Sequence, residues 1–137
     1  MATLNVTYDR ATGERPLTIH THQDVDAFLD RMRALAHAGP VPPLAEIVVA
    51  EDPYGTPFLY VGIDQDSGWI REPGEPDRWT IGTSDATGTT PYDYAGHGEN
   101  IPTRHIVPLT TVRTVLTTYL DHQGIVPDDD PNLRPTT

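Results

Sequence analysis

The clearest pattern of hydrophobic and polar positions predicts a helix over about residues 22–37. Thr21 and Asp24 have the spacing of a capping box, with Asp in place of the usual Glu or Gln, and Gly39 and Pro40 follow as a stop signal. The apolar positions recur at i, i+3, i+4, i+7, i+10 and i+11, which is one face of a helix. They are Val25, Phe28, Leu29, Met32, Leu35 and Ala36.

A second helix is predicted over about residues 108–121. Pro108 suits the first helical position, and Gly124 is a plausible residue just beyond the last turn. The apolar side chains that share one face of this helix are Leu109, Val112, Leu116, Tyr119 and Leu120.

Several shorter segments have the alternation or the β-branched and aromatic content of strands. Residues 9–14 are expected to form a turn after the first of them. The predicted strands are residues 3–8, 16–20, 44–50, 57–63, 69–72, 79–81 and 91–94. The order of elements predicts an α+β fold: an antiparallel or mixed β-sheet of about 5–7 strands with both helices on one face.

One domain is expected over residues 1–124, because 137 residues are a usual domain length and no repeat appears. Residues 125–137 carry Asp128, Asp129 and Asp130 among three prolines, and are expected to form a loosely ordered tail.

Charge narrows the possible partners. Twenty Asp and Glu oppose nine Arg, lysine is absent, and the formal net charge is −11. The arginines are scattered singly, which argues against nucleic-acid binding, and the acidic surface favours a basic protein partner.

The chain also lacks the features of a secreted or membrane protein. It has no cysteine, its first residues do not resemble a signal peptide, and no apolar run is long enough to span a membrane. We therefore expect a cytoplasmic protein.

Catalytic and metal-binding patterns are weak. His20 and His22, or His97 and His105 around Glu99, could supply imidazoles, but neither spacing matches a known zinc pattern. Neither serine lies in a Gly-x-Ser-x-Gly elbow, and no phosphate-binding loop appears. We expect no catalytic residue, no metal and no cofactor, although a small metal-dependent hydrolase stays open as an alternative.

Aromatic and acidic residues are interleaved in the loop-rich middle of the chain. Aromatic side chains supply contact area in interfaces, and carboxylates attract and pair with a cationic partner. The predicted partner-binding residues are Asp64, Asp66, Trp69, Glu72, Glu75, Asp77, Trp79, Asp85, Tyr92, Asp93 and Tyr94. The alternative is that the aromatic residues fill the core while the carboxylates only face solvent.

Short motifs, in their order along residues 4–124, resemble the Imm1 family of bacterial immunity proteins. The motifs are Val6-Thr7-Tyr8-Asp9, Asp24-Val25-Asp26-Ala27-Phe28-Leu29, Leu59-Tyr60-Val61-Gly62, Asp66-Ser67-Gly68, Tyr92-Asp93-Tyr94-Ala95-Gly96 and Val107-Pro108 with Val112-Arg113 and Tyr119-Leu120. Gly124-Ile125-Val126-Pro127 fits a further family segment, but the tryptophan that commonly follows it is replaced by acidic residues.

The resemblance implies a non-enzymatic protein that binds and neutralises a toxin encoded nearby, often a nucleic-acid deaminase or nuclease of a polymorphic toxin system. The preference for Arg over Lys and the Ala, Pro and Thr content suggest an actinobacterial source. An alternative is a stand-alone structural or adaptor domain that forms homodimers.

Overall fold

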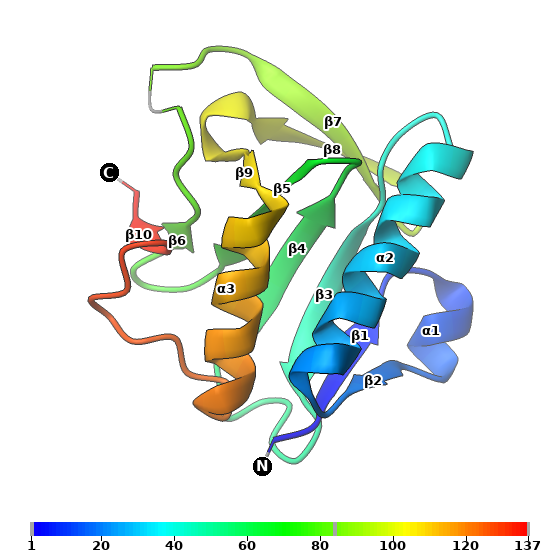
Figure 1. Cartoon of the computed structure of the whole chain (residues 1–137), viewed down its shortest axis with the longest axis vertical. Helices are drawn as coiled ribbons and strands as arrows, with labels where there is room; N and C mark the ends of the chain where they lie inside the picture. The colour runs from blue at the N-terminus through cyan, green and yellow to red at the C-terminus, as the bar shows by residue number, and fades with distance from the viewer. Residues whose placement is uncertain (1, 84, 137) are drawn as a thin grey trace.

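An eight-stranded antiparallel sheet forms the middle layer of the computed structural model, which describes residues 2–83 and 85–136 (Figure 1). The strand order is β10-β6-β5-β4-β3-β1-β2, with β9 paired to β5. The strands are β1 (Leu4–Thr7), β2 (Leu17–Ile19), β3 (Leu44–Val49), β4 (Leu59–Ile63), β5 (Ser67–Glu72), β6 (Arg78–Trp79), β9 (Val107–Pro108) and β10 (Arg134–Pro135).

Two helices cover one face of this sheet: α2 (His22–Ala38) and α3 (Leu109–Asp121) (Figure 1). Their apolar faces join the inward positions of β1, β3 and β4 in one core, in which Val25, Met32 and Leu116 are fully buried. The expected α+β class and the helix pair on one face are confirmed. No helix in the described part of the chain is long and apolar enough to cross a membrane.

The helix starts follow the sequence closely. Thr21 caps α2 and Asp24 completes a reciprocal capping box, as expected. Pro108 is instead the residue before α3: with Val107 it forms the short strand β9, and the helix begins at Leu109.

The hairpin of β7 (Thr89–Tyr94) and β8 (His97–Pro102) lies on the other face of the sheet (Figure 1). The backbone N–H of Asp93 donates to the carbonyl of Pro42 at 2.9 Å, which ties the hairpin to the start of β3. Ala95 and Gly96, both with positive φ, make the two-residue turn that hairpins favour.

Residues 9–14 form a short helix rather than the expected turn. Asp9 accepts a hydrogen bond from the backbone N–H of Thr12, and the Thr12 hydroxyl accepts one from the backbone N–H of Asp9. This reciprocal capping satisfies amide groups at the N-terminus of the helix, so α1 (Arg10–Glu14) completes a helical turn despite Gly13.

The C-terminal segment is packed, which differs from the expected loosely ordered tail. Val126 and Leu133 are buried, and β10 pairs with β6. Arg78 holds this segment: it donates twice to the Glu72 carboxylate, at 2.9 Å each, and also to the carbonyls of Val126 and Pro127. The burial of this fully hydrogen-bonded ion pair explains the order of the segment.

Replacement of Arg78 by methionine tests this interaction. The change leaves the Glu72 carboxylate buried without its partner, so we expect the free energy of unfolding to fall by about 3–5 kcal/mol. Urea denaturation measures the change. Arg113→Met, which breaks the exposed pair with Asp26, is the matched control and should change stability far less. Equal losses in the two variants would contradict the proposed importance of the buried pair.

Candidate partner-binding surface

The second face of the sheet is only partly covered, because the hairpin β7-β8 lies over one end of it. Side chains alternate along strands, so Leu44, Tyr60, Trp69 and Arg71 point to this face while Val61 and Ile70 point to the helices. The hairpin buries Leu44 and Trp69. Tyr60 and Arg71 remain half-buried at the uncovered part.

A glycine makes room for the largest buried side chain of this face. The indole edge of Trp69 that carries Nε1 lies against Gly62 of β4, where any Cβ atom would overlap it. Trp69 is thereby able to lie flat across two strands and is only 1% exposed. Its Nε1 is a buried donor that no described residue accepts from.

Trp69 is the centre of an aromatic cluster. Its ring centroid lies 5.7 Å from that of Trp79 and 5.6 Å from that of Tyr92, the latter edge to face. Trp79 in turn stacks on His105 at 4.3 Å. Burial lowers the pKa of His105, although its Nδ1 lies 3.0 Å from the carbonyl of Thr80. The neutral imidazole therefore behaves as part of the apolar cluster.

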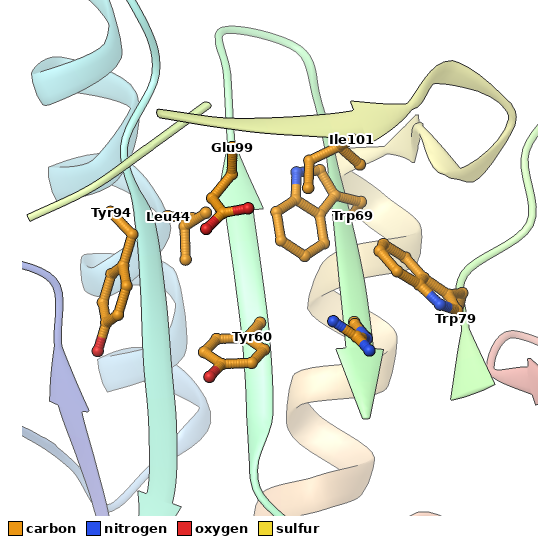
Figure 2. A pocket seen from close by; sticks show the side chains of 8 residues that line it. Leu44, Tyr60, Trp69, Trp79, Tyr94, Glu99 and Ile101 are labelled. Carbon is orange, nitrogen blue, oxygen red and sulfur yellow. The ribbon is translucent and has the colours of Figure 1, made fainter. Parts of the chain in front are cut away.

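A pocket of about 160 Å³ lies between this cluster and the hairpin, and we call it the aromatic pocket. Its lining side chains come from β3, β4, β5 and β6 of the sheet and from both hairpin strands, as can be followed in Figure 2. Its lining residues are Leu44, Tyr60, Trp69, Arg71, Trp79, Tyr94, Glu99 and Ile101.

The charged groups around the aromatic pocket are partly paired. Arg71 donates to Asp77 at 2.9 Å, and its guanidinium carbon lies 5.2 Å from the centroid of the Trp79 ring. The Tyr94 hydroxyl donates to Glu46 at 3.0 Å. Burial, together with this hydrogen bond and the negative charge of Glu46, raises the pKa of Tyr94 to about 12. Glu99 makes no hydrogen bond or ion pair with any residue that the structure describes (2–83 and 85–136).

Four predicted partner-binding residues have little accessible surface. Trp69 and Tyr92 are 1% exposed inside the aromatic cluster, which is the core position that the sequence offered as the alternative. Glu72 is 8% exposed and paired with Arg78, and these three side chains cannot reach a partner in this conformation. Trp79 is 9% exposed and lines the aromatic pocket.

The remaining predicted residues do not form one patch. Asp64 and Asp66 flank the β4–β5 turn, whereas Glu75 follows the other end of β5, about 17 Å away at the usual rise per residue. Asp85 lies in the loop before β7, and Asp93 is on the hairpin. Besides the buried Trp69, the predicted residues Asp77, Trp79 and Tyr94 lie at the aromatic pocket or its rim.

The sequence prediction missed four residues of this surface: Glu46, Tyr60, Arg71 and Glu99. Tyr60 and Arg71 stand opposite each other in the β4–β5 pairing. The signal available in the sequence was the alternation along residues 69–72, which puts Trp69 and Arg71 on one face. Glu99 reaches this surface only because the hairpin places it there, and no local sequence pattern predicts that placement.

The histidines considered for metal binding lie in different surroundings. His22 pairs with Asp121, His20 contacts the Thr3 hydroxyl, and His105 is buried while His97 is exposed. Over residues 2–83 and 85–136, no group of three or more His, Cys, Asp or Glu side chains is arranged to hold a metal ion.

Comparison with known families agrees with the resemblance in the sequence. The family model described as immunity protein Imm1 matches residues 13–135 of the 137 residues. The chain belongs to the Imm1 family. No curated protein matches it. The Imm1 match extends from α1 to β10, and so includes the C-terminal segment held by Arg78.

Membership of Imm1 assigns the protein a toxin-neutralising immunity role, in a family whose members are generally non-enzymatic. A cognate toxin is the partner that this role implies. The aromatic pocket and its uncovered surroundings are the candidate surface for that partner, because they combine aromatic area with the exposed carboxylate of Glu99.

Gly62→Ala tests whether the glycine makes room for Trp69. The added methyl group must displace the indole, so we expect a loss of about 1–3 kcal/mol in the free energy of unfolding and an altered near-UV circular dichroism of tryptophan. Gly98→Ala is the matched control, since a Cβ atom there meets nothing within 4 Å. An unchanged tryptophan signal in Gly62→Ala would contradict the packing described above.

The raised pKa of Tyr94 predicts a pH effect at the alkaline end. An unfolded chain releases the Tyr94 proton near pH 10, before the folded protein does, so this residue's contribution to stability falls as pH rises from about 10 to about 12. Ultraviolet titration of phenolate formation should lose one late-titrating phenol in Tyr94→Phe, and Glu46→Gln should move that phenol to lower pH. Tyr60, Tyr92 and Tyr119, whose pKa values burial also raises, still titrate late in Tyr94→Phe. Tyr54→Phe, which deletes a phenol that is 99% exposed, should leave all the late-titrating phenols in place.

Proposed function

We propose that the protein binds a cognate toxin that has a basic substrate cleft, of the nucleic-acid deaminase or nuclease type, and neutralises it by occluding that cleft. The Imm1 match over residues 13–135 carries this proposal, since neutralisation of a toxin is the role of the family. Occlusion needs contact area and charge but no catalytic group.

Charge supports a basic partner. A net charge of −11 on 137 residues gives a field that attracts cationic surfaces and repels nucleic acid. A toxin that holds a polynucleotide must offer the opposite charge in its cleft. The two surfaces are therefore complementary, and the inhibitor competes for the site that a phosphate backbone would occupy.

The distribution of carboxylates indicates how the partner is attracted and where it is held. Asp64 and Asp66 at one end of β5, and Glu75 and Asp85 elsewhere, are too far apart to contact a small cleft together. They contribute to long-range steering, whereas close contact is made at the uncovered sheet face by Asp77, Trp79 and Tyr94 with Asp93 nearby on the hairpin. We place this binding in the cytoplasm, where a nuclease or deaminase finds its substrate.

Co-expression with the neighbouring open reading frame tests the proposal directly. We expect that frame to arrest growth alone and the present protein to restore it. Restoration should also occur with a purified pair in a nuclease or deaminase assay. A neighbouring protein that is harmless, or whose toxicity is unchanged by co-expression, would contradict the immunity role.

Steering predicts a salt-dependent association rate. With the purified toxin, we expect the association rate constant to fall steadily as sodium chloride rises, because added ions screen the attraction. Two double variants, Asp64→Lys with Asp66→Lys and Glu75→Lys with Asp85→Lys, should both slow association and leave the dissociation rate nearly unchanged. Glu72 is left intact because it is paired inside the fold. Association that is independent of both salt and these charges would contradict steering.

A further inference from the structure

The aromatic pocket has the size of a site for one side chain. Its volume of about 160 Å³ is below the ~300–1,000 Å³ usual for sites that enclose a small molecule. Figure 2 shows the rings of Tyr60, Tyr94 and Trp79 around its uncovered side, with Leu44 and Trp69 farther under the hairpin. Such a pocket fits a flat or slender group that enters from the uncovered sheet face.

The charge of the aromatic pocket selects a cation. Arg71 is paired with Asp77, and the Glu46 carboxylate accepts a hydrogen bond from the Tyr94 hydroxyl. Glu99 adds a second carboxylate, exposed and without a hydrogen bond or ion pair to the described part of the chain. The surroundings of the pocket therefore hold two more carboxylates than cations. The electron-rich faces of the aromatic rings also favour positive charge.

The molecule itself shows how a guanidinium binds on this face. Arg71 lies over the Trp79 ring, with its guanidinium carbon 5.2 Å from the ring centroid, and donates to the Asp77 carboxylate at 2.9 Å. Tyr60, Tyr94 and Glu99 offer a second combination of aromatic ring and carboxylate on the opposite side of the aromatic pocket, with the two tyrosine rings edge to face. A planar guanidinium can stack on one ring and donate two parallel hydrogen bonds to the carboxylate, which an ammonium group cannot do.

Trp69 contributes the apolar floor of the aromatic pocket under the hairpin (Figure 2). Its indole Nε1 is buried against Gly62 and next to Tyr92, and neither residue lines the pocket, so this nitrogen does not bind the ligand. The ligand therefore meets an aromatic floor and a carboxylate, Glu99, at the uncovered side.

We propose that the aromatic pocket is the anchor site for an arginine side chain on a surface loop of the toxin, with Glu99 as the carboxylate that receives the guanidinium. This inference rests on the proposed function for the identity of the partner. Arginine in an aromatic pocket at the centre of an interface is a frequent source of binding energy. The guanidinium stacks on one of the two tyrosine rings, Tyr60 or Tyr94, and meets the edge of the other, because these rings lie edge to face.

Titration of the full chain with a small probe tests the anchor site without the toxin. The probe is N-acetyl-arginine-N-methylamide, which has a guanidinium and peptide carbonyls, and the matched control is the citrulline analogue, which has nearly the same shape and no charge. We expect saturable shifts of the Trp69 and Trp79 indole N–H resonances with the arginine probe, about tenfold weaker with the citrulline probe because charge-assisted hydrogen bonds are lost. The two resonances are assigned with Trp79→Phe.

Two variants locate the site. Glu99→Gln should weaken binding of the arginine probe about tenfold, while Glu14→Gln, the same change at an exposed carboxylate outside the pocket, should have no effect. Equal affinity for both probes, no saturable shift at either indole, or an unchanged affinity in Glu99→Gln would overturn the proposal. Equally tight binding of tetramethylammonium would also overturn it, because the pocket would then select a small free cation.

The toxin complex separates the two proposals. If Glu99→Gln still binds and neutralises the toxin as tightly as the unaltered protein, the anchor site is wrong while the immunity function stands. If the arginine probe binds at Glu99 but no neighbouring toxin is neutralised, the immunity function is wrong. Faster dissociation of the Glu99→Gln complex, with its association rate little changed, is the result that supports both.

Discussion

A sheet has two faces, and this protein has helices for only one of them. The helices α2 and α3 seal the face that carries the aliphatic side chains, where Val25, Met32 and Leu116 are fully buried. The opposite face must be covered by a hairpin of two strands, which is too narrow for a sheet of eight. Aromatic residues suit such a partly covered face. Beneath the hairpin they bury a large area, and at its border their rings line the aromatic pocket and remain partly accessible.

The incomplete cover links the fold to the role of the Imm1 family. A binding protein needs accessible apolar area without a large exposed hydrophobic patch. Here that area is divided: Trp69 and Tyr92 are sealed, Tyr60 and Tyr94 are half-buried, and Arg71 with Asp77 and Glu99 make the border polar. The surface thus keeps its largest rings covered and still has rings and carboxylates for the cationic partner proposed above.

Local patterns in the sequence were sufficient for much of the fold. The 3.6-residue period predicted α2 and α3 to within about one residue, because amphipathic helices reveal their buried face. Alternation indicated β1, and β-branched or nearly continuous apolar content indicated β3 and β4. Pro108 was misplaced by one position, since a proline suits both the first turn and the residue before it. α1 was missed because its stability comes from the reciprocal hydrogen bonds of Asp9 and Thr12.

The candidate surface was harder to predict, because it is made by contacts between distant segments. The strand β8, His-Gly-Glu-Asn-Ile-Pro, is mostly polar, and only its partner β7 and the Ala95-Gly96 turn make it a strand. The position of Glu99 could not be predicted without β8. In the same way, no local sequence pattern distinguishes the buried Trp69 from the more accessible Tyr94. Glu72 resembles any surface carboxylate until Arg78 folds against it across six residues of a hairpin.

The pairing of β10 with β6 also affects how the molecule behaves among its own copies. An open sheet edge presents unpaired amide and carbonyl groups on which another chain can add a strand. The strand β10 (Arg134–Pro135) occupies that position at the β6 end, and the segment before it is held by the Val126 and Pro127 carbonyls on Arg78. The strand at the other edge, β2, is only three residues long. Both edges of the sheet therefore offer few unpaired groups to another copy of the protein, which lowers the risk of edge-to-edge aggregation at high concentration.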